Sequence, residues 1–400
     1  MTASPENLFI RPSFPNFKDL PWHLPLEEWH KVYPLLENLP RGISRHAVIF
    51  IEYQDSHFAL KELPPNIAET EFNNLVKMEE SRLQTVIPAG YAEINLPAFH
   101  SSVLITRYLE RSIPYCSLFS MEHMSRYREH LMDAIVALLV QLHLAGYFWG
   151  DCSLSNTLFR RDAGQLQAYL VDAETSVAFS GKIPPIYRYD DLNILEANLE
   201  SDLLDLTEES IPLQINPKDT GTYISLQYQK LWEEITKELL VKPGENYRLQ
   251  EHIRALNNLG YSIGSIETIE TDCGENLRLH VAVTDQNYHR DQLYQYTGLC
   301  TEEMQARQMI NEIHELKASL SHRENRSVSL AQAAEFWMEH YYKPTLVKLQ
   351  PFIDMRADPA ELYCEVLENK WYLSEQARQD VGHAAATEDY IRNHIVNQIN

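Results

Sequence analysis

Short apolar runs separated by turn residues dominate the first part of the chain, and such runs predict β-strands. The expected strands span residues 47–53, 57–63, 88–94 and 102–109. Residues 68–83 carry apolar side chains at the spacing of an amphipathic helix. Before the first strand, a proline-rich segment predicts an extended arm anchored by Trp22, and residues 25–39 predict a short helix. We therefore expect an antiparallel sheet with one helix.

Helical spacing dominates from residue 121 onward. Residues 121–144 predict one long helix that becomes wholly apolar, which is typical of a helix buried in the centre of a helical lobe. Further helices are expected over residues 220–241, 246–259, 286–296, 301–320, 330–349 and 359–381, with a bend at Pro344 and a small hairpin around residues 272–275. The pattern predicts an α+β chain with three parts: residues 1–38, 39–204 and 205–400.

Composition narrows the range of functions. The 400 residues include 34 Lys and Arg against 57 Asp and Glu, a net charge of -23, which disfavours nucleic acid and anionic membranes as partners. Five widely spaced cysteines fit reduced thiols, and the first residues lack the basic and apolar segments of a secretory signal. No run is long enough for a transmembrane segment. We expect a cytoplasmic protein of two domains.

One polar stretch interrupts the apolar pattern. Asp151 lies on an expected loop, Asn156 follows five residues later, and Asp172 ends the apolar run 166–171. Residues 158–159 and 166–171 predict a hairpin, so Asn156 and Asp172 can converge at its ends. ATP-dependent phosphoryl transfer needs this arrangement, with Asp151 as the base for a hydroxyl and the other two as magnesium ligands. An isolated Asp and Asn would more often cap a turn, but the hairpin favours a site.

Lys61 lies on the expected strand 57–63. It could be a solubility residue on an edge strand, but its Ala-Leu-Lys setting favours a phosphate-binding role. Such a lysine needs a carboxylate from the next helix. Glu71, in the first turns of residues 68–83, is the first choice and Glu79 the second, although either could be a solvated helix charge.

Two further segments are candidates for nucleotide contact. Gly42 and Ser44 occupy the place of a loop that covers the phosphates, although a single glycine is a weak signal. Arg107 and Leu109 lie in the segment that should connect the two lobes, where backbone N–H and C=O groups would meet the adenine edge. Asp190 or Asp191 could cap the next helix or brace the Asp151 loop.

The order of Lys61, Glu71, Asp151, Asn156 and Asp172 resembles the protein-kinase superfamily. The sequence of residues 148–156 resembles that of bacterial proteins of the lipopolysaccharide (Kdo/heptose) kinase group that carry a C-terminal domain of unknown function. That domain is matched at residues 297–299, 303–307 and 365–374. The resemblance implies a two-lobed protein-kinase-like fold, with an antiparallel N-lobe sheet and a helical C-lobe, plus a mostly α-helical C-terminal domain.

The resemblance also implies ATP and Mg as cofactors and a hydroxyl-bearing acceptor that is a small molecule, a glycan or a protein. Two positions depart from the usual kinase pattern. Trp149 replaces a His or Tyr, and Ser153 stands where many kinases have a cation that steadies the migrating phosphoryl group. Two alternative functions are therefore a nucleotide-binding regulator without turnover and a helical interaction scaffold.

Overall fold

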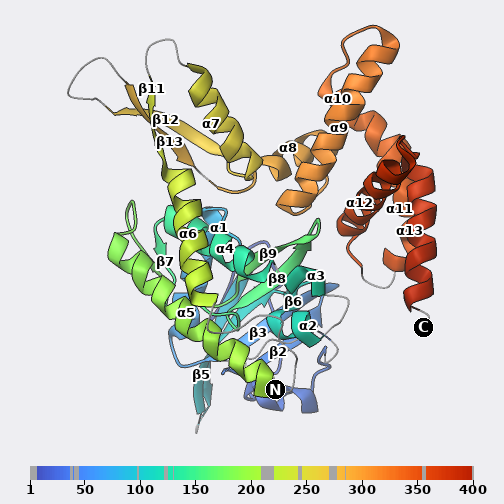
Figure 1. The fold of residues 1–400 in the computed structure, drawn as a ribbon. Helices are drawn as coiled ribbons and strands as arrows, with labels where there is room; N and C mark the ends of the chain where they lie inside the picture. Colours follow the sequence, from blue (N-terminus) through green and yellow to red (C-terminus); the bar gives the residue numbers. More distant parts are fainter. Residues whose placement is uncertain are drawn as a thin grey trace. The chain divides into compact units, whose positions relative to one another are not determined.

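The structure is a computed structural model that describes residues 7–36, 39, 45–96, 99–120, 125–128, 130–208, 220–241, 246–269, 277–283, 285–353 and 357–398. The chain divides into two compact units (Figure 1). The first unit contains Met1–Arg160 and Ala168–Glu234, and the second contains Arg161–Gln167 and Ile235–Asn400. The main division between the units falls after Glu234.

An antiparallel five-stranded sheet forms one end of the first unit, with strand order β1-β4-β5-β3-β2. Its strands are β1 (Asn7–Ile10), β2 (Val48–Tyr53), β3 (Ser56–Leu63), β4 (Pro88–Leu96) and β5 (Phe99–Arg107). Helix α1 (Ile67–Glu80) buries Phe72, Leu75 and Met78. Strand β1 lies in the expected extended arm and pairs with β4, from Asn7 opposite Glu93 to Ile10 opposite Gly90.

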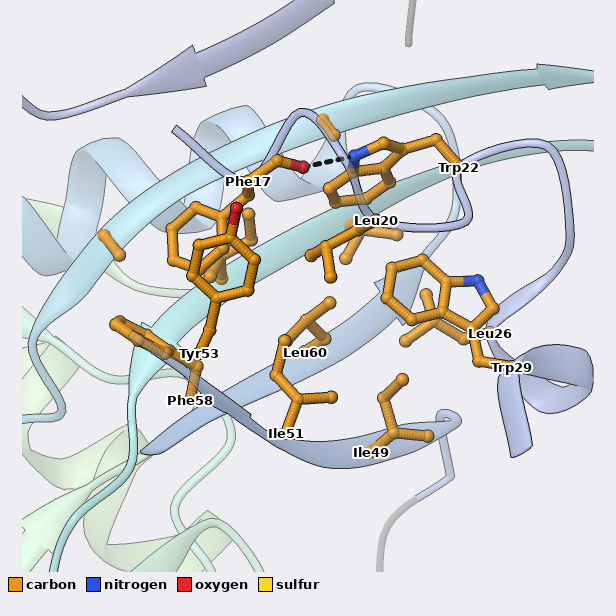
Figure 2. Packing of buried hydrophobic residues seen from close by; sticks show 14 of the residues in the cluster. Phe17, Leu20, Trp22, Leu26, Trp29, Ile49, Ile51, Tyr53, Phe58 and Leu60 are labelled. Carbon is orange, nitrogen blue, oxygen red and sulfur yellow. Dashed lines mark hydrogen bonds between the residues drawn. The ribbon is translucent and has the colours of Figure 1, made fainter. Parts of the chain in front are cut away.

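The remainder of the N-terminal arm supplies core to this sheet. Figure 2 shows Phe17, Leu20, Trp22, Leu26 and Trp29 packed against side chains of β2 and β3, with Trp22 Nε1 donating to Phe17 O at 2.7 Å. Trp22 is therefore an anchor, as expected. The helix expected over residues 25–39 is instead a short 3-10 helix, η1 (Leu26–Lys31). Pro34 lacks an N–H donor and favours an extended residue before it, which explains the early end.

The helical part of the first unit surrounds an apolar helix, α4 (Leu131–Leu144), whose Ile135, Leu138 and Leu142 are fully buried. The single helix expected over residues 121–144 is divided, because α3 (Ser125–Arg128) is separate, and residues 121–124 and 129 lie outside the described residues. The other helices of this part are α2 (Tyr115–Ser120), α5 (Pro185–Glu208) and α6 (Thr220–Thr236).

Short strands of the helical part position the central loop. Strands β6 (Ile113–Pro114), β8 (Thr157–Asp162) and β9 (Gln165–Leu170) form one small sheet. Strand β7 (Tyr147–Phe148) pairs with β10 (Val177–Ala178). The loop between β7 and β8 carries Asp151, and the segment between β9 and β10 carries Asp172.

The second unit begins with a three-stranded antiparallel sheet and continues with helices. Strand order is β11-β13-β12, and the expected hairpin is its β12–β13 pair. The elements are β11 (Glu238–Val241), α7 (Asn246–Asn258), β12 (Ile263–Ile269), β13 (Leu277–Val283), α8 (Tyr288–Thr297), α9 (Glu303–Glu324), α10 (Leu330–Trp337), η4 (Met338–Tyr342), α11 (Lys343–Ile353), α12 (Pro359–Ala377) and α13 (Gly382–Gln398). The end of the helix expected over residues 220–241 is therefore strand β11.

Two expected helices of the second unit are interrupted. A π-helix, η4, separates α10 from α11 where a bend at Pro344 was expected, and a proline two residues beyond η4 weakens the regular hydrogen-bond ladder there. The helix expected over residues 359–381 ends at Ala377, because Arg378 adopts a left-handed conformation at φ 54°. Helix α13 then begins at Gly382.

Candidate active site

Asp151 and Asn156 meet within the loop between β7 and β8. Asn156 Nδ2 donates to Asp151 Oδ2 at 2.9 Å and to Asp151 O at 3.0 Å. Asn198 Nδ2 on α5 donates to Asp151 Oδ1 at 3.4 Å and to Cys152 O at 2.9 Å. The Asp151 carboxylate is therefore oriented by two side-chain amides. Because Asn156 uses its nitrogen on Asp151, its Oδ1 is the atom suited to a metal ion.

Asp191 holds the backbone in front of Asp151. Its fully buried carboxylate accepts hydrogen bonds from Trp149 N and Gly150 N, both at 2.8 Å. Gly150 has φ +84°, and a Cβ there would lie 3.0 Å from Thr175 O, so the loop requires glycine at this point. Of the two acids considered as a brace, Asp191 has this contact.

The Asp191 carboxylate also contacts two buried titratable groups. His143 Nε2 lies 2.9 Å from Asp191 Oδ2, and His143 Nδ1 lies 2.7 Å from the Tyr228 hydroxyl on α6. Burial lowers the pKa of His143 despite Asp191. Burial, aided by Asp191, raises the pKa of the Cys152 thiol well above its usual range. The two titratable groups that contact Asp191, His143 and the Cys152 thiol, are therefore neutral.

The second half of the loop is held by Asp202, which the sequence reasoning missed. Asp202 Oδ2 accepts from Leu154 N at 2.8 Å and Ser155 N at 3.3 Å. Burial raises the pKa of Asp202 to about 6, although these two N–H groups oppose the shift. Ser153 Oγ accepts from Asn156 N at 3.1 Å and lies 2.9 Å from Ser155 Oγ. Ser153 therefore shapes the turn that presents Asn156.

Trp149 links this loop to the segment that carries Asp172. Its indole is fully buried, and Nε1 donates to Asp172 O at 3.2 Å. Thr175 Oγ1 donates back to Trp149 O at 2.9 Å. A second link joins Val171 N to Asn156 O at 3.1 Å. These contacts bring Asp172 and the Asp151 loop into one arrangement.

Lys61 lies between two carboxylates. Its Nζ is 2.5 Å from Asp172 Oδ2 and 3.1 Å from Glu71 Oε2. The pair between Lys61 and Glu71 corresponds to the first choice of partner, because Glu79 pairs instead with Arg11 at 2.6 Å. Asn74, on the same helix as Glu71, donates to Ala173 O at 2.9 Å. Helix α1 is therefore attached to the Asp172 segment.

Electrostatics in this cluster depend on burial as well as pairing. Burial lowers the pKa of Lys61, but Glu71 and Asp172 more than compensate, so the net shift is upward. Burial raises the pKa of the fully buried Glu71 to about 7, and Asp172 adds to that shift, while Lys61 opposes it. Lys61 divides its charge between two carboxylates, so it only partly stabilises ionised Glu71. The cluster holds a cationic Lys61 at neutral pH.

Carboxylates around Asp172 could hold a divalent cation. Glu71, Asp172 and Glu174 each offer an oxygen, and these atoms lie within 4.8 Å of one another. These are carboxylate oxygens, which are among the ligands that Mg²⁺ prefers, so the three residues fit this ion. Asn156 as a further ligand stays a prediction. Glu174 was not among the expected ligands. Its position two residues after Asp172, on the same segment, is the signal that could have indicated it.

Of the four residues expected to contact the nucleotide, the structure describes two. Gly42 and Ser44 lie outside the described residues. Arg107 has an exposed side chain, and its N–H donates to Ile87 O at 2.8 Å. Leu109 O accepts from Ser112 N at 3.2 Å. Contact of Arg107 and Leu109 with adenine therefore stays a prediction.

Two family models match the chain. Residues 53–210 match the lipopolysaccharide kinase (Kdo/WaaP) family. The Kdo/WaaP-like region thus contains Lys61, Glu71, Asp151, Asn156 and Asp172. Residues 230–395 match a second family, described as a domain of unknown function (DUF4032). The expected resemblance is confirmed for both parts, and the fold is kinase-like with a mostly helical C-terminal region.

Curated proteins and solved structures were also compared with the chain. No curated protein matches the chain. Among solved structures, the chain is similar to one described as WaaP in complex with acyl carrier protein, with a TM-score of 0.36 and 16% identity, over 63% of this chain and 98% of that one. Within the part of the chain that the structure describes, no helix combines the length and apolar character needed to cross a membrane.

Proposed function

We propose that the chain is an ATP- and Mg-dependent phosphotransferase that acts on a hydroxyl group. The observation that carries this proposal is the convergence of Lys61 from β3, Glu71 from α1 and Asp172, with Lys61 Nζ within 3.1 Å of both carboxylates. Kinase-like chemistry needs such a cation for phosphates and such an acid for metal. The match of residues 53–210 to a lipopolysaccharide kinase family supports the same reaction class.

Each residue has a proposed task. Lys61 would bind the α- and β-phosphates while Glu71 holds its ammonium in place. Asp172 and Asn156, with Glu174 beside them, would hold magnesium, which when bound neutralises phosphate charge. Asp151, oriented by Asn156 and Asn198, would accept the proton of the attacking hydroxyl. Gly42, Ser44, Arg107 and Leu109 are proposed nucleotide contacts.

The acceptor is proposed to be a sugar hydroxyl, because the matching family is described by its action on lipopolysaccharide. The wider proposal includes hydroxyls of small molecules, other glycans and proteins. In each case the acceptor oxygen must approach the Asp151 carboxylate within hydrogen-bond distance. Asp151 is only partly buried, so the carboxylate is accessible for such an approach.

A nucleotide-binding regulator without turnover is the second candidate. The observation that favours it is Ser153, which uses its hydroxyl on Asn156 N and Ser155 Oγ and brings no cation to the phosphoryl group. A chain of this kind would bind Mg-ATP and leave it intact. It would use the same Lys61 and Asp172, so binding alone does not separate the two candidates.

Thermal unfolding and ADP release, measured together, test the proposal. The full chain is heated with ATP and Mg²⁺, with ATP and EDTA, and with Mg²⁺ alone. Stabilisation that needs both ATP and Mg²⁺, with ADP release increased by a sugar acceptor, is expected. Stabilisation without ADP release would favour the regulator, and absence of any stabilisation would contradict both. Glu52→Ala, at an exposed position on β2, is a control that should behave as the parent.

A further inference from the structure

The tip of the β8–β9 hairpin is part of the second unit, although the rest of both strands belongs to the first. Residues Arg161–Gln167 belong to the second unit. Strand β8 begins directly after Asn156, and β9 ends at Leu170, just before the Asp172 segment. One hairpin therefore has two proposed magnesium ligands at its base and a segment of the second unit at its tip.

Asp162 binds the tip to the start of α9. Its carboxylate is almost fully buried, with Oδ1 accepting from Gln305 N at 2.8 Å and Oδ2 from Met304 N at 3.1 Å. N–H groups in the first turn of a helix lack intrahelical acceptors and need acceptors from elsewhere in the chain. Asp162 therefore adds acceptors from a distant part of the chain to the first turn of α9, which also has a capping box of Glu302 and Gln305.

Gln305 and Glu361 bind the backbone of the tip. Gln305 Nε2 donates to Arg161 O at 3.1 Å and to Glu361 Oε2 at 2.9 Å. Glu361, in the first turn of α12, accepts from Ala163 N at 2.7 Å and Gly164 N at 3.3 Å. Both side chains are fully buried. The tip is thus held by polar groups that have no access to water as an alternative partner.

The conformation of the tip depends on these contacts. Ala163 and Gly164 have φ values of 52° and 82°, as in the two-residue turns that join hairpin strands. Alanine seldom adopts this conformation, so surrounding contacts must hold it. Glu361 supplies them by accepting both N–H groups. At the edge of the tip, Arg161 Nη1 lies 3.4 Å from Glu365 Oε1.

We propose that Asp162, Gln305 and Glu361 are positioning residues for the metal site. By holding the tip of the hairpin, they fix the spacing and orientation of Asn156 and Asp172 at its base. The two strands have six residues each, a length of roughly 20 Å. Hydrogen-bonded strands transmit a displacement of the tip because they move as a pair. The domain of unknown function would then contribute to catalysis. This contribution to catalysis rests on the function proposed above.

The test compares the loss of acceptors at two helix N-termini in the full chain. Asp162→Ala removes two acceptors from the first turn of α9 and leaves the Glu302–Gln305 capping box. Ser329→Ala removes the cap of α10, where Ser329 Oγ accepts from Gln332 N at 3.2 Å. Amide hydrogen exchange is followed by mass spectrometry in peptides covering residues 154–157 and 170–173. The Mg²⁺ concentration for half-maximal stabilisation by ATP is measured on the same samples.

Asp162→Ala should accelerate exchange in both peptides and raise the half-maximal Mg²⁺ concentration by roughly threefold to tenfold, a typical size for coupling between sites. Ser329→Ala should lower the melting temperature without either effect. Equal behaviour of the two variants in these peptides would mean that Asp162 only stabilises the fold, and the proposal would be wrong.

A charge exchange keeps the test decisive if Asp162→Ala does not fold. Arg161 and Glu365 are partly exposed, so their variants should remain folded. Arg161→Glu and Glu365→Arg should each raise the Mg²⁺ requirement. The double variant should require less Mg²⁺ than either single variant, although it still lacks the hydrogen bond from the Tyr390 hydroxyl to Glu365. Single variants without effect, or a double variant that is no better than either, would overturn the proposal.

Hydrogen exchange separates this proposal from the proposed function, because it is measured without nucleotide and needs no turnover. If the parent chain shows no stabilisation by Mg-ATP, the proposed function fails. The exchange rates of the two peptides still decide whether the second unit positions the base of the hairpin.

Discussion

Lys61 Nζ lies 2.5 Å from Asp172 Oδ2, so the proposed phosphate-binding cation is paired with the proposed metal-binding acid. The same ammonium is 3.1 Å from Glu71 Oε2. In the proposed complex with Mg-ATP, the phosphates would take over as the partner of Lys61 and the magnesium ion as the partner of Asp172. Under the proposed function, nucleotide and metal would therefore act on this cluster together.

Lys61→Met should abolish most of the stabilisation by Mg-ATP, because it removes the phosphate-binding charge. It also leaves Glu71 fully buried without its cation, and such a loss costs about 3–5 kcal/mol unless the acid takes up a proton. Thermal unfolding with and without Mg-ATP measures both effects. Lys77→Met, at an exposed position on α1, is the matched control. Full nucleotide response in Lys61→Met would assign the phosphate role to another residue.

Glu71 should make stability depend on pH in the acidic range. Its pKa is about 7 in the folded chain and about 4.5 when unfolded, so the folded state binds more protons between these values. Stability should therefore fall as pH rises from 4.5 to 7, by roughly 3 kcal/mol relative to Glu71→Gln, which cannot titrate. Unfolding curves of both proteins from pH 4 to 8 measure the difference. Parallel profiles would show that Glu71 does not titrate there.

Asp172→Ala should eliminate the Mg²⁺-dependent part of ATP binding, since it removes the acid around which the other oxygens gather. Glu174→Gln should weaken Mg²⁺ binding less, because the amide retains one oxygen ligand. Titration of Mg²⁺ at fixed ATP, followed by thermal unfolding, ranks the two variants. An unchanged Mg²⁺ requirement in Asp172→Ala would show that the metal lies elsewhere.

Asp151→Asn should lower turnover by about 10²–10⁴-fold, the usual effect of losing a general base. ATP binding should persist, because Lys61 and Asp172 are untouched. One oxygen remains to accept from Asn156 or Asn198, so the loss of stability should be small. Asp190→Asn, the neighbour of the bracing Asp191 on α5, is the control. Normal turnover in Asp151→Asn would remove the residue from the proposed mechanism.

Trp149→Ala should cost about 3–5 kcal/mol in stability, because it leaves a large cavity beside the Asp172 segment. Trp149→Phe keeps most of the ring volume but loses the hydrogen bond to Asp172 O, worth about 1 kcal/mol. Chemical denaturation of both variants measures the two contributions. If Trp149→Ala were as stable as the parent, the indole would not be a packing element.

Local pattern was enough to predict the parts of the site that lie near one another in sequence. Asn156 and Asp172 could be proposed as neighbours because the hairpin between them follows from the spacing of apolar residues. Lys61 and Glu71 could be proposed as a pair because a strand is followed directly by an amphipathic helix, and their functional roles stay predictions. The kinase-like fold class was implied by the resemblance to the protein-kinase superfamily and is confirmed.

Contacts between distant residues were harder to predict. Asp202 binds Leu154 N from a helix far along the chain, and no spacing rule connects them. Strand β1 could not be predicted, because its partner β4 is distant and its sequence is short and flanked by prolines. The length of α12 depends on the left-handed Arg378, a conformation that residue type does not indicate.

The β8–β9 tip also bears on the modular character of the chain. Sequence comparison assigns residues 161–167 to the Kdo/WaaP-like region, which ends before the DUF4032 match begins at residue 230. In the structure, those same residues belong to the second unit. A fragment starting at residue 230 would leave buried Gln305 and Glu361 without the backbone groups that they bind. The two regions are therefore separate as sequence families, but the C-terminal region includes a piece of the kinase-like region in its interior.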